Sequence, residues 1–216
     1  MNEDINRFNT ERSIYLVLKK NGPMTLEEIG KEIKISKMGA LKWIRKLEND
    51  GLISRKIKKN QNGRPSFLFE IKKGSQIDSE SSGSEKILVD LFAFLKRMGN
   101  EDLGKKFLEE RYEKIYRENF QIFLQGDISI KILKLKEMRE KDGYMPELKM
   151  TPSSDYNLME YNCPIFKIAS MFPEACEMER KMFEKLLNAR VESSHRQVDG
   201  NYNCHFCISS QDQLHP

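Results

Sequence analysis

Residues 25–47, TLEEIGKEIKISKMGALKWIRKL, decide the fold of the N-terminal part of this chain. Thr25 stands three residues before Glu28, which is the spacing of a capping box at the start of a helix. Ser36 is placed to cap a second helix after a short turn at Lys34-Ile35. The apolar positions of the first of these helices are Leu26, Ile29 and Ile33. Two short helices joined by a tight turn predict a helix-turn-helix.

The second helix has two different faces. Its apolar face consists of Ala40, Leu41, Ile44 and Leu47. Another stripe, at positions i, i+3, i+4 and i+7, consists of Gly39, Lys42, Trp43 and Lys46. That stripe is too polar to lie in a core, so we expect it on the surface of the domain.

The segments on either side complete a winged helix. A preceding helix is predicted, with Thr10 as its cap and Asn21-Gly22-Pro23 as its end. After the second helix of the turn motif, residues 52–57 and 67–71 alternate as two short strands around a turn-rich segment. Three helices followed by a hairpin are typical of a winged helix-turn-helix domain, which we predict over residues 1–75.

Positive charge is concentrated in the same part of the chain. The whole chain carries a net charge of +4, but residues 34–73 contain twelve Lys or Arg against three acidic residues. This segment therefore carries +9 and the remainder −5. The asymmetry predicts a polyanionic partner. In a helix-turn-helix the second helix enters the major groove, so we expect double-stranded DNA.

The DNA contacts are predicted on this helix and on the hairpin. The candidates are Lys37, Lys42, Trp43, Arg45 and Lys46 on the helix, and Arg55, Lys56, Lys58, Lys59 and Arg64 on the hairpin. Lysines at such an interface mostly contact phosphates and position the protein, whereas base contacts specify the sequence. Two alternatives stay open: a solvated basic face used for protein contacts, and a Trp43 that packs against the hairpin or a dimer partner.

A flexible linker is predicted after the winged helix. Residues 74–85, GSQIDSESSGSE, are rich in Ser and lack apolar periodicity, and we place the linker at 76–84. Helical apolar repeats continue through a region at 85–142, including a predicted helix at 128–141. We expect this region to form a homodimer through residues 85–98, because a two-fold dimer doubles the DNA contact and matches a palindromic operator.

All four cysteines lie in the last quarter of the chain, at Cys163, Cys176, Cys204 and Cys207. The first two stand near the starts of predicted helices, and the last two form a CxxC in a strand-like run. In a reducing compartment this clustering suggests a metal or redox centre rather than disulfides. Four thiolates suit a structural zinc or an iron–sulfur cluster. The predicted fold class is α+β, with residues 143–216 as an α+β metal-cluster domain.

Several short motifs occur in a fixed order along the chain, namely Gly63-Arg64-Pro65, Asn162-Cys163-Pro164, Cys176 and the run GNYNCHF at 200–206. With the winged helix, linker and helical region, this order resembles the SufR-type iron–sulfur regulators, a branch near the ArsR and DeoR winged-helix repressors. The resemblance implies a homodimeric transcription repressor whose DNA affinity is controlled by an iron–sulfur cluster, [4Fe-4S] ranked ahead of [2Fe-2S]. The residues that match the family's ligand positions are Cys163, Cys176 and Cys204.

The fourth ligand departs from the family pattern. Many members have another cysteine between the second and the last, where this chain has none and offers Arg190 and His195. We rank Cys207 first, His195 second and His205 third. Residues i and i+3 of a regular strand face opposite sides, so Cys207 can bind beside Cys204 only through a turn or a bulge. Zinc is the alternative cofactor, in a winged-helix regulator or a scaffold without cluster sensing.

The remaining features argue against other classes of function. Apolar residues make up 38% and charged residues 32% of the chain, which is typical of a globular protein in water. No run of about 18 apolar residues occurs, and Glu3 and Asp4 stand where a signal peptide needs positive charge. We therefore expect a cytoplasmic protein without membrane contact. The CxxC is the one enzyme-like feature, since the chain lacks a phosphate-binding Gly-rich loop and a nucleophile signature, so we predict no catalysis.

Overall fold

In a computed structural model the chain forms two units, Met1–Ser79 and Glu80–Pro216. The structure describes residues 2–58, 66–72, 75, 83–151 and 155–209. Most of the predicted linker at 76–84 lies outside these residues. The helical region predicted at 85–142 and the cysteine-bearing domain predicted at 143–216 share one hydrophobic core in the second unit, so the structure does not separate them.

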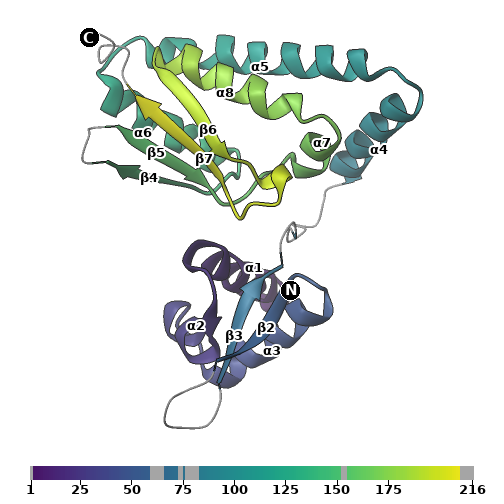
Figure 1. Cartoon of the computed structure of the whole chain (residues 1–216), viewed down its shortest axis with the longest axis vertical. Helices are drawn as coiled ribbons and strands as arrows, with labels where there is room; N and C mark the ends of the chain where they lie inside the picture. The colour runs from purple at the N-terminus through teal and green to yellow at the C-terminus, as the bar shows by residue number, and fades with distance from the viewer. Residues whose placement is uncertain (1, 59–65, 73–74, 76–82, 152–154, 210–216) are drawn as a thin grey trace. The chain divides into compact units, whose positions relative to one another are not determined.

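The described part of the first unit contains three helices and a three-stranded antiparallel sheet (Figure 1). Its elements are α1 (Asn2–Asn21), β1 (Met24–Thr25), α2 (Leu26–Glu32), α3 (Lys37–Asn49), β2 (Ile53–Lys58) and β3 (Ser66–Ile71), with strand order β1-β3-β2. Helix α1 begins before its predicted cap at Thr10. Strand β1 is only two residues long, so it is too short to show an alternating apolar pattern in the sequence.

The caps predicted for α2 and α3 are confirmed. In the capping box, the Thr25 hydroxyl accepts from the Glu28 amide at 3.3 Å and the Glu28 carboxylate accepts from the Thr25 amide at 2.7 Å. Ser36 Oγ accepts from the Gly39 amide at 3.1 Å. These bonds satisfy backbone donors that the first turn of a helix leaves unpaired. The three side chains therefore define where the two helices begin.

The apolar faces of the helices meet in one core. Ile14 and Leu18 of α1 pack with Ile44 and Leu47 of α3 and with Ile53 of the sheet. All five side chains are almost completely removed from solvent. Because the apolar stripe of α3 points inward, its polar stripe faces solvent, as the sequence predicts.

The second unit builds five α-helices, a short 3₁₀-helix and a four-stranded antiparallel sheet from its described residues (Figure 1). The helices are α4 (Gly83–Arg97), α5 (Glu101–Phe123), α6 (Ile128–Lys141), α7 (Phe166–Met171) and α8 (Glu174–Leu187), with η1 at Gln197–Asp199. The strands are β4 (Pro146–Met150), β5 (Tyr156–Glu160), β6 (Arg190–His195) and β7 (Cys204–Ser209), in the order β4-β5-β7-β6. The predicted helix at 128–141 coincides with α6, whereas β6 has no counterpart among the predicted elements.

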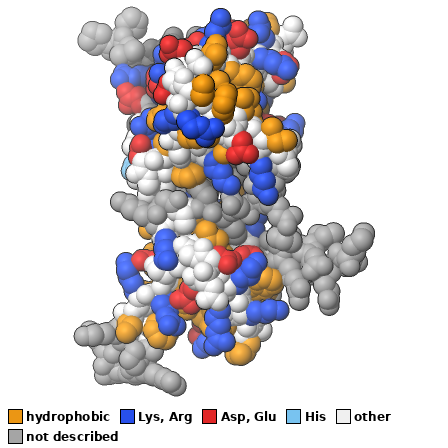
Figure 2. Space-filling view, turned by 90° about the vertical axis from the view of Figure 1, so that its right-hand side faces the viewer, with side chains coloured by type: hydrophobic (Ala, Val, Ile, Leu, Met, Phe, Trp, Pro, Cys, Tyr) orange, Lys and Arg blue, Asp and Glu red, His pale blue; other side chains and the backbone are white. Residues whose placement is uncertain are grey.

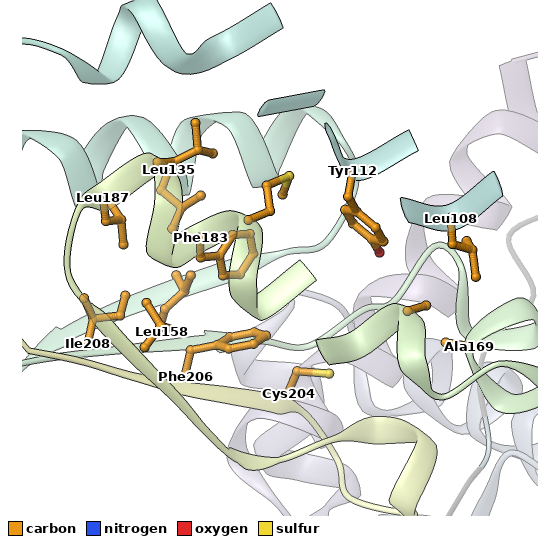
Figure 3. Packing of buried hydrophobic residues seen from close by; sticks show 14 of the residues in the cluster. Leu108, Tyr112, Leu135, Leu158, Ala169, Phe183, Leu187, Cys204, Phe206 and Ile208 are labelled. Atoms are coloured by element: carbon orange, nitrogen blue, oxygen red, sulfur yellow. The ribbon is translucent and has the colours of Figure 1, made fainter. Parts of the chain in front are cut away.

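Strand β7 shows how the sheet divides its side chains between two faces. Cys204, Phe206 and Ile208 are buried in the core, while His205 and Cys207 on the other face are partly exposed. The Phe183 ring of α8 meets the Phe206 ring edge-on, with centroids 5.1 Å apart (Figure 3). The alternation has period two, as in any regular strand. It places the two residues of the CxxC on opposite faces.

A buried ion network joins α6, β5 and α8. Arg139 Nη2 donates to Glu160 Oε2 at 2.9 Å and to Glu179 Oε1 at 2.7 Å. The guanidinium carbon lies 3.2 Å from the centroid of the Tyr144 ring. Burial raises the pKa of the Glu160 carboxyl to about 7, against the opposing effect of Arg139. One cation thus forms hydrogen bonds with two buried carboxylates.

Candidate nucleic-acid interface and cysteine site

The exposed face of α3 carries half of the predicted DNA contacts. Lys37, Lys42, Arg45 and Lys46 are exposed, while Trp43 is half-buried and packs against the core of the first unit. The ammonium groups of Lys42 and Lys46 lie 5.5 Å and 5.9 Å from the centroid of the Trp43 ring. At this range a cation is attracted to the face of an indole ring. Trp43 therefore anchors α3 to the core and orients two of its lysines.

Internal ion pairs divide the predicted cations into two groups. Three of them are neutralised by carboxylates, as Lys46 pairs with Glu11 at 2.6 Å, Arg55 with Glu48 at 3.6 Å and Lys56 with Glu70 at 2.7 Å. Lys37, Lys42 and Arg45 have no such pair within the part of the chain that the structure describes. A cation without a carboxylate neighbour keeps its full attraction for a phosphate, so these three are the strongest candidates for DNA contact.

The hairpin of β2 and β3 supplies further positive charge. Lys58, at the end of β2, is exposed. The Arg55 guanidinium lies 5.1 Å from the centroid of the Phe67 ring on the neighbouring strand. The predicted contacts Lys59 and Arg64 lie outside the described residues. Of the predicted wing contacts, the described strands place Arg55, Lys56 and Lys58 at exposed positions of β2.

Three of the four cysteines come together in the second unit. Cys163 precedes α7, Cys176 lies in the first turn of α8 and Cys204 begins β7. They lie within electrostatic range, since Cys176 and Cys204 both act to raise the pKa of the Cys163 thiol, although burial is the largest cause. Burial likewise raises the pKa of Cys176 to about 11 and that of Cys204 to about 12. Without a metal, all three are neutral thiols at pH 7.

Cys207, the first-ranked fourth ligand, does not join them. Its thiol lies on the opposite face of the sheet, where Sγ contacts Asn157 Oδ1 at 3.5 Å and His205 Nε2 at 3.9 Å. The register of β7 with β5 is regular from Cys204 to Ile208, so the bulge that would bring both CxxC thiols together is missing from this stretch. The prediction that Cys207 lies beside Cys204 is therefore wrong for this structure.

The second and third choices, His195 and His205, lie on the same face as Cys207. Their rings stack with centroids 5.6 Å apart. Ser194 Oγ contacts Nδ1 of His195 at 2.9 Å and Nδ1 of His205 at 2.8 Å. Among the described residues, no group of three or more His, Cys, Asp or Glu side chains is arranged to hold a metal ion. The thiols of Cys163, Cys176 and Cys204 influence one another electrostatically, but in this arrangement they do not form a metal-binding group.

A surface cavity of about 640 Å³ reaches Cys176 from outside. It lies between α8 and β6 and is lined by charged side chains, including Arg180, Arg190 and Arg196. Arg196 is one of the groups that act on the Cys176 thiol, where its charge opposes the increase in pKa that burial causes. Of the three thiols, Cys176 is therefore the one that this cavity connects to solvent.

The family model for winged helix-turn-helix DNA-binding matches residues 7–54. The three helices and the hairpin of the first unit have the winged helix-turn-helix fold that this family model describes. Its second helix of the turn motif is α3, so the exposed cations of α3 lie on the element that enters the major groove in such domains. The predicted winged helix is confirmed.

Solved structures similar to this chain have low identities to it. A mutant of ZitR from Lactococcus lactis in the apo form is 19% identical, covers 53% of this chain and 88% of its own, and has a TM-score of 0.27. PadR from Bacillus subtilis in complex with operator DNA is 17% identical, with 82% and 95% covered and a TM-score of 0.27. An H-NOX protein from S. oneidensis in the Fe(II)NO state is 12% identical, with 63% and 81% covered and a TM-score of 0.39. No curated protein matches the chain.

Some features of the winged-helix domain escape a reading of the sequence. Glu11 of α1 neutralises Lys46, a pairing across 35 positions that no local pattern reveals. Met38 is exposed on the same face of α3 as Lys42, four residues later, a spacing that could have identified it.

In the described part of the chain, none of the helices has the length and apolar character needed to cross a lipid bilayer.

Proposed function

We propose that this chain is a homodimeric transcription regulator, which binds DNA through its winged-helix domain and responds to an iron–sulfur cluster held by its cysteines. The observation that carries DNA binding is the set of unpaired cations on α3, Lys37, Lys42 and Arg45, within a domain that matches the winged-helix family. In winged-helix domains this helix enters the major groove of DNA, whose phosphates attract the positive charges of these three residues.

DNA binding is tested with the full chain and a fluorescein-labelled duplex of mixed sequence. Affinity should fall steeply as salt rises, because bound cations displace condensed counterions from the phosphates. The variant Arg45→Ala should bind about three- to tenfold more weakly with a salt slope reduced by about one. Lys31→Ala is the control, since Lys31 is exposed on α2 and pairs with Glu27. Equal binding by both variants would contradict the assignment of α3.

The proposed dimer forms through an apolar surface on α4 and the start of α5. Ile87, Leu91 and Phe94 follow one another at helical spacing on α4 and Met98 comes directly after the helix, with exposed fractions from 46% to 71%. Leu103 and Phe107 of α5 add to this surface. Figure 2 faces the side on which α4 lies in Figure 1, and hydrophobic side chains gather there on the second unit. A contiguous apolar surface of this kind favours a protein contact, and it overlaps the predicted seam at 85–98.

The oligomeric state tests this surface directly. The variant Leu91→Glu should elute as a monomer in light-scattering chromatography, because a carboxylate would be buried without a partner in the interface. Leu133→Glu is the matched control, as Leu133 on α6 is 53% exposed and Leu91 is 49% exposed. A dimer that survives Leu91→Glu but not Leu133→Glu would place the contact on α6 instead.

The proposed cofactor site is built by Cys163, Cys176 and Cys204. Support comes from the electrostatic influence of the three thiols on one another and from the resemblance of their spacing to the SufR-type regulators. An iron–sulfur cluster bound there would supply a group sensitive to iron supply and oxidants. The buried thiols must lose their protons to become metal ligands, so metal affinity should rise with pH.

Anaerobic purification tests the cofactor. We expect a brown protein with absorption near 400 nm and with iron and sulfide in the same preparation, which Cys163→Ser, Cys176→Ser and Cys204→Ser should each abolish. Cys207→Ser should retain iron, because Cys207 lies on the other face of β7. A colourless protein with bound zinc would overturn the iron–sulfur proposal in favour of a zinc-binding regulator. Iron loss in Cys207→Ser would mean that β7 rearranges to bring Cys207 to the metal.

A further inference from the structure

The exposed stripe of α3 begins with an apolar residue. Met38, Lys42, Arg45 and Asn49 follow at positions i, i+4, i+7 and i+11, and all four are exposed. Met38 is the second residue of the helix, and 72% of it is accessible to solvent. Exposing a large apolar side chain to water is unfavourable, and Met38 has a much larger accessible fraction than a core residue of α3 such as Ile44. The position of Met38 therefore suggests a binding role.

The place of Met38 on α3 decides what it can contact. In helix-turn-helix complexes, the first residues of the recognition helix contact base edges in the major groove. Lys37 precedes Met38, and Lys42 and Arg45 follow on the same exposed stripe. With these cations on the phosphates that flank the groove, the exposed Met38 side chain would face the bases between them.

The chemistry of Met restricts which base it can recognise. A thioether has no hydrogen to donate and is only a weak acceptor, so it cannot read the polar groups of a base edge as Arg, Asn or Gln do. The apolar group in the major groove is the C5 methyl of thymine. Met is also unbranched and flexible, which lets it adjust to a methyl group at the groove floor.

We propose that Met38 determines sequence specificity by packing against the C5 methyl group of a thymine in each half-site. The inference rests on the proposed DNA-binding function and adds to it the base that one residue selects. Burial of one methyl group corresponds to about 0.8 kcal/mol, or about fourfold in affinity. The effect is therefore modest for each half-site, and it concerns one base rather than overall binding.

The experiment begins by selecting preferred duplexes from a random library with the full-length protein. Each thymine of the selected site is then replaced by uracil, which removes only the C5 methyl group. For the unaltered protein, uracil at this position in one half-site should weaken binding about fourfold, and uracil in both half-sites about 16-fold. Met38→Ala should bind thymine and uracil sites equally. Met150→Ala is the matched control, because Met150 of β4 is 70% exposed and lies in the other unit, and it should keep the full uracil effect.

A second variant tests the same assignment through a change in base preference instead of a loss of affinity. Met38→Gln adds a side chain that can form two hydrogen bonds with adenine, so the selected base should change from thymine to adenine at that position. If Met38→Ala retains the uracil effect, or if Met38→Gln selects the same sites as the unaltered protein, the assignment of Met38 is overturned while DNA binding stands. If no sequence is enriched and the protein does not bind DNA, the proposed function fails and the role of Met38 fails with it.

Discussion

Replacing Arg139 by Met should destabilise the second unit severely. The guanidinium is 3% exposed, and its partners Glu160 and Glu179 have side chains that are 1% and 7% exposed. Removing the cation would leave two carboxyl groups in the core with no opposite charge. Breaking a buried pair in this way costs about 3–5 kcal/mol. For a unit of this size the midpoint of thermal unfolding should fall by roughly 10–15 °C.

The loss should depend on pH with a definite sign. Burial already raises the pKa of Glu160 to about 7, and removal of Arg139 should raise it further. A carboxyl whose pKa is higher in the folded state than in the unfolded state costs stability as pH rises between the two values. The difference between Arg139→Met and the unaltered protein should therefore be largest near pH 8 and smaller near pH 5.

The two units can be followed separately in one experiment. Trp43 is the single tryptophan, so its fluorescence during urea unfolding reports the first unit, while circular dichroism at 222 nm reports both. Arg139→Met should shift the unfolding of the second unit, which circular dichroism detects, and should leave the fluorescence transition of the first unit unchanged. Lys136→Met on the same helix removes the Lys136–Glu140 pair, which is partly exposed, and should cost less than about 1 kcal/mol. A loss below about 1 kcal/mol for Arg139→Met, equal at both pH values, would refute the reasoning.

Three further predictions follow from local geometry. Gly104→Ala should destabilise the second unit by about 1–3 kcal/mol in urea, because the new Cβ would lie 2.7 Å from the ring of Phe172; an unchanged midpoint would contradict this. In metal-free Cys207→Ser protein, whose other thiols have raised pKa values, thiolate absorbance at 240 nm should stay small at pH 9, and because the pKa values of Cys176 and Cys204 are about 11 and 12, ionisation of these thiols in the unfolded chain should favour unfolding as pH rises above 9. Ser36→Ala should lower the stability reported by tryptophan fluorescence by about 1 kcal/mol, and no change would mean that the cap is dispensable.

Local patterns in the sequence predict most of the helices. The hydroxyls of Thr25 and Ser36 act within three residues, so their effect can be read directly from the chain. The apolar spacing at 128–141 likewise predicts α6, because a helix face repeats within a few residues. The winged-helix domain, which combines such local signals with concentrated charge, is the part of the fold that the sequence predicts best.

Features that depend on distant partners escape prediction. The segment RVESSH of β6 is mostly polar and becomes a strand only through pairing with β7. Arg139 meets Glu160 and Glu179 across 21 and 40 positions, so nothing in its local sequence distinguishes it from a surface arginine. For the cysteines, the family resemblance predicts a site of Cys163, Cys176 and Cys204, but the position of Cys207 follows from the register of β7.

The contacts of Ser194 fix where protons lie on the less buried face of the second sheet. Its hydroxyl carries one hydrogen but faces a ring nitrogen of His195 and one of His205, so one of these nitrogens must donate. Nε2 of His205 faces Asn157 Oδ1 at 2.9 Å and donates to it, so His205 accepts from Ser194 through Nδ1. His195 must then carry its hydrogen on Nδ1. The hydrogen thus lies on Nε2 of His205 and on Nδ1 of His195, and a single side-chain hydroxyl determines both positions.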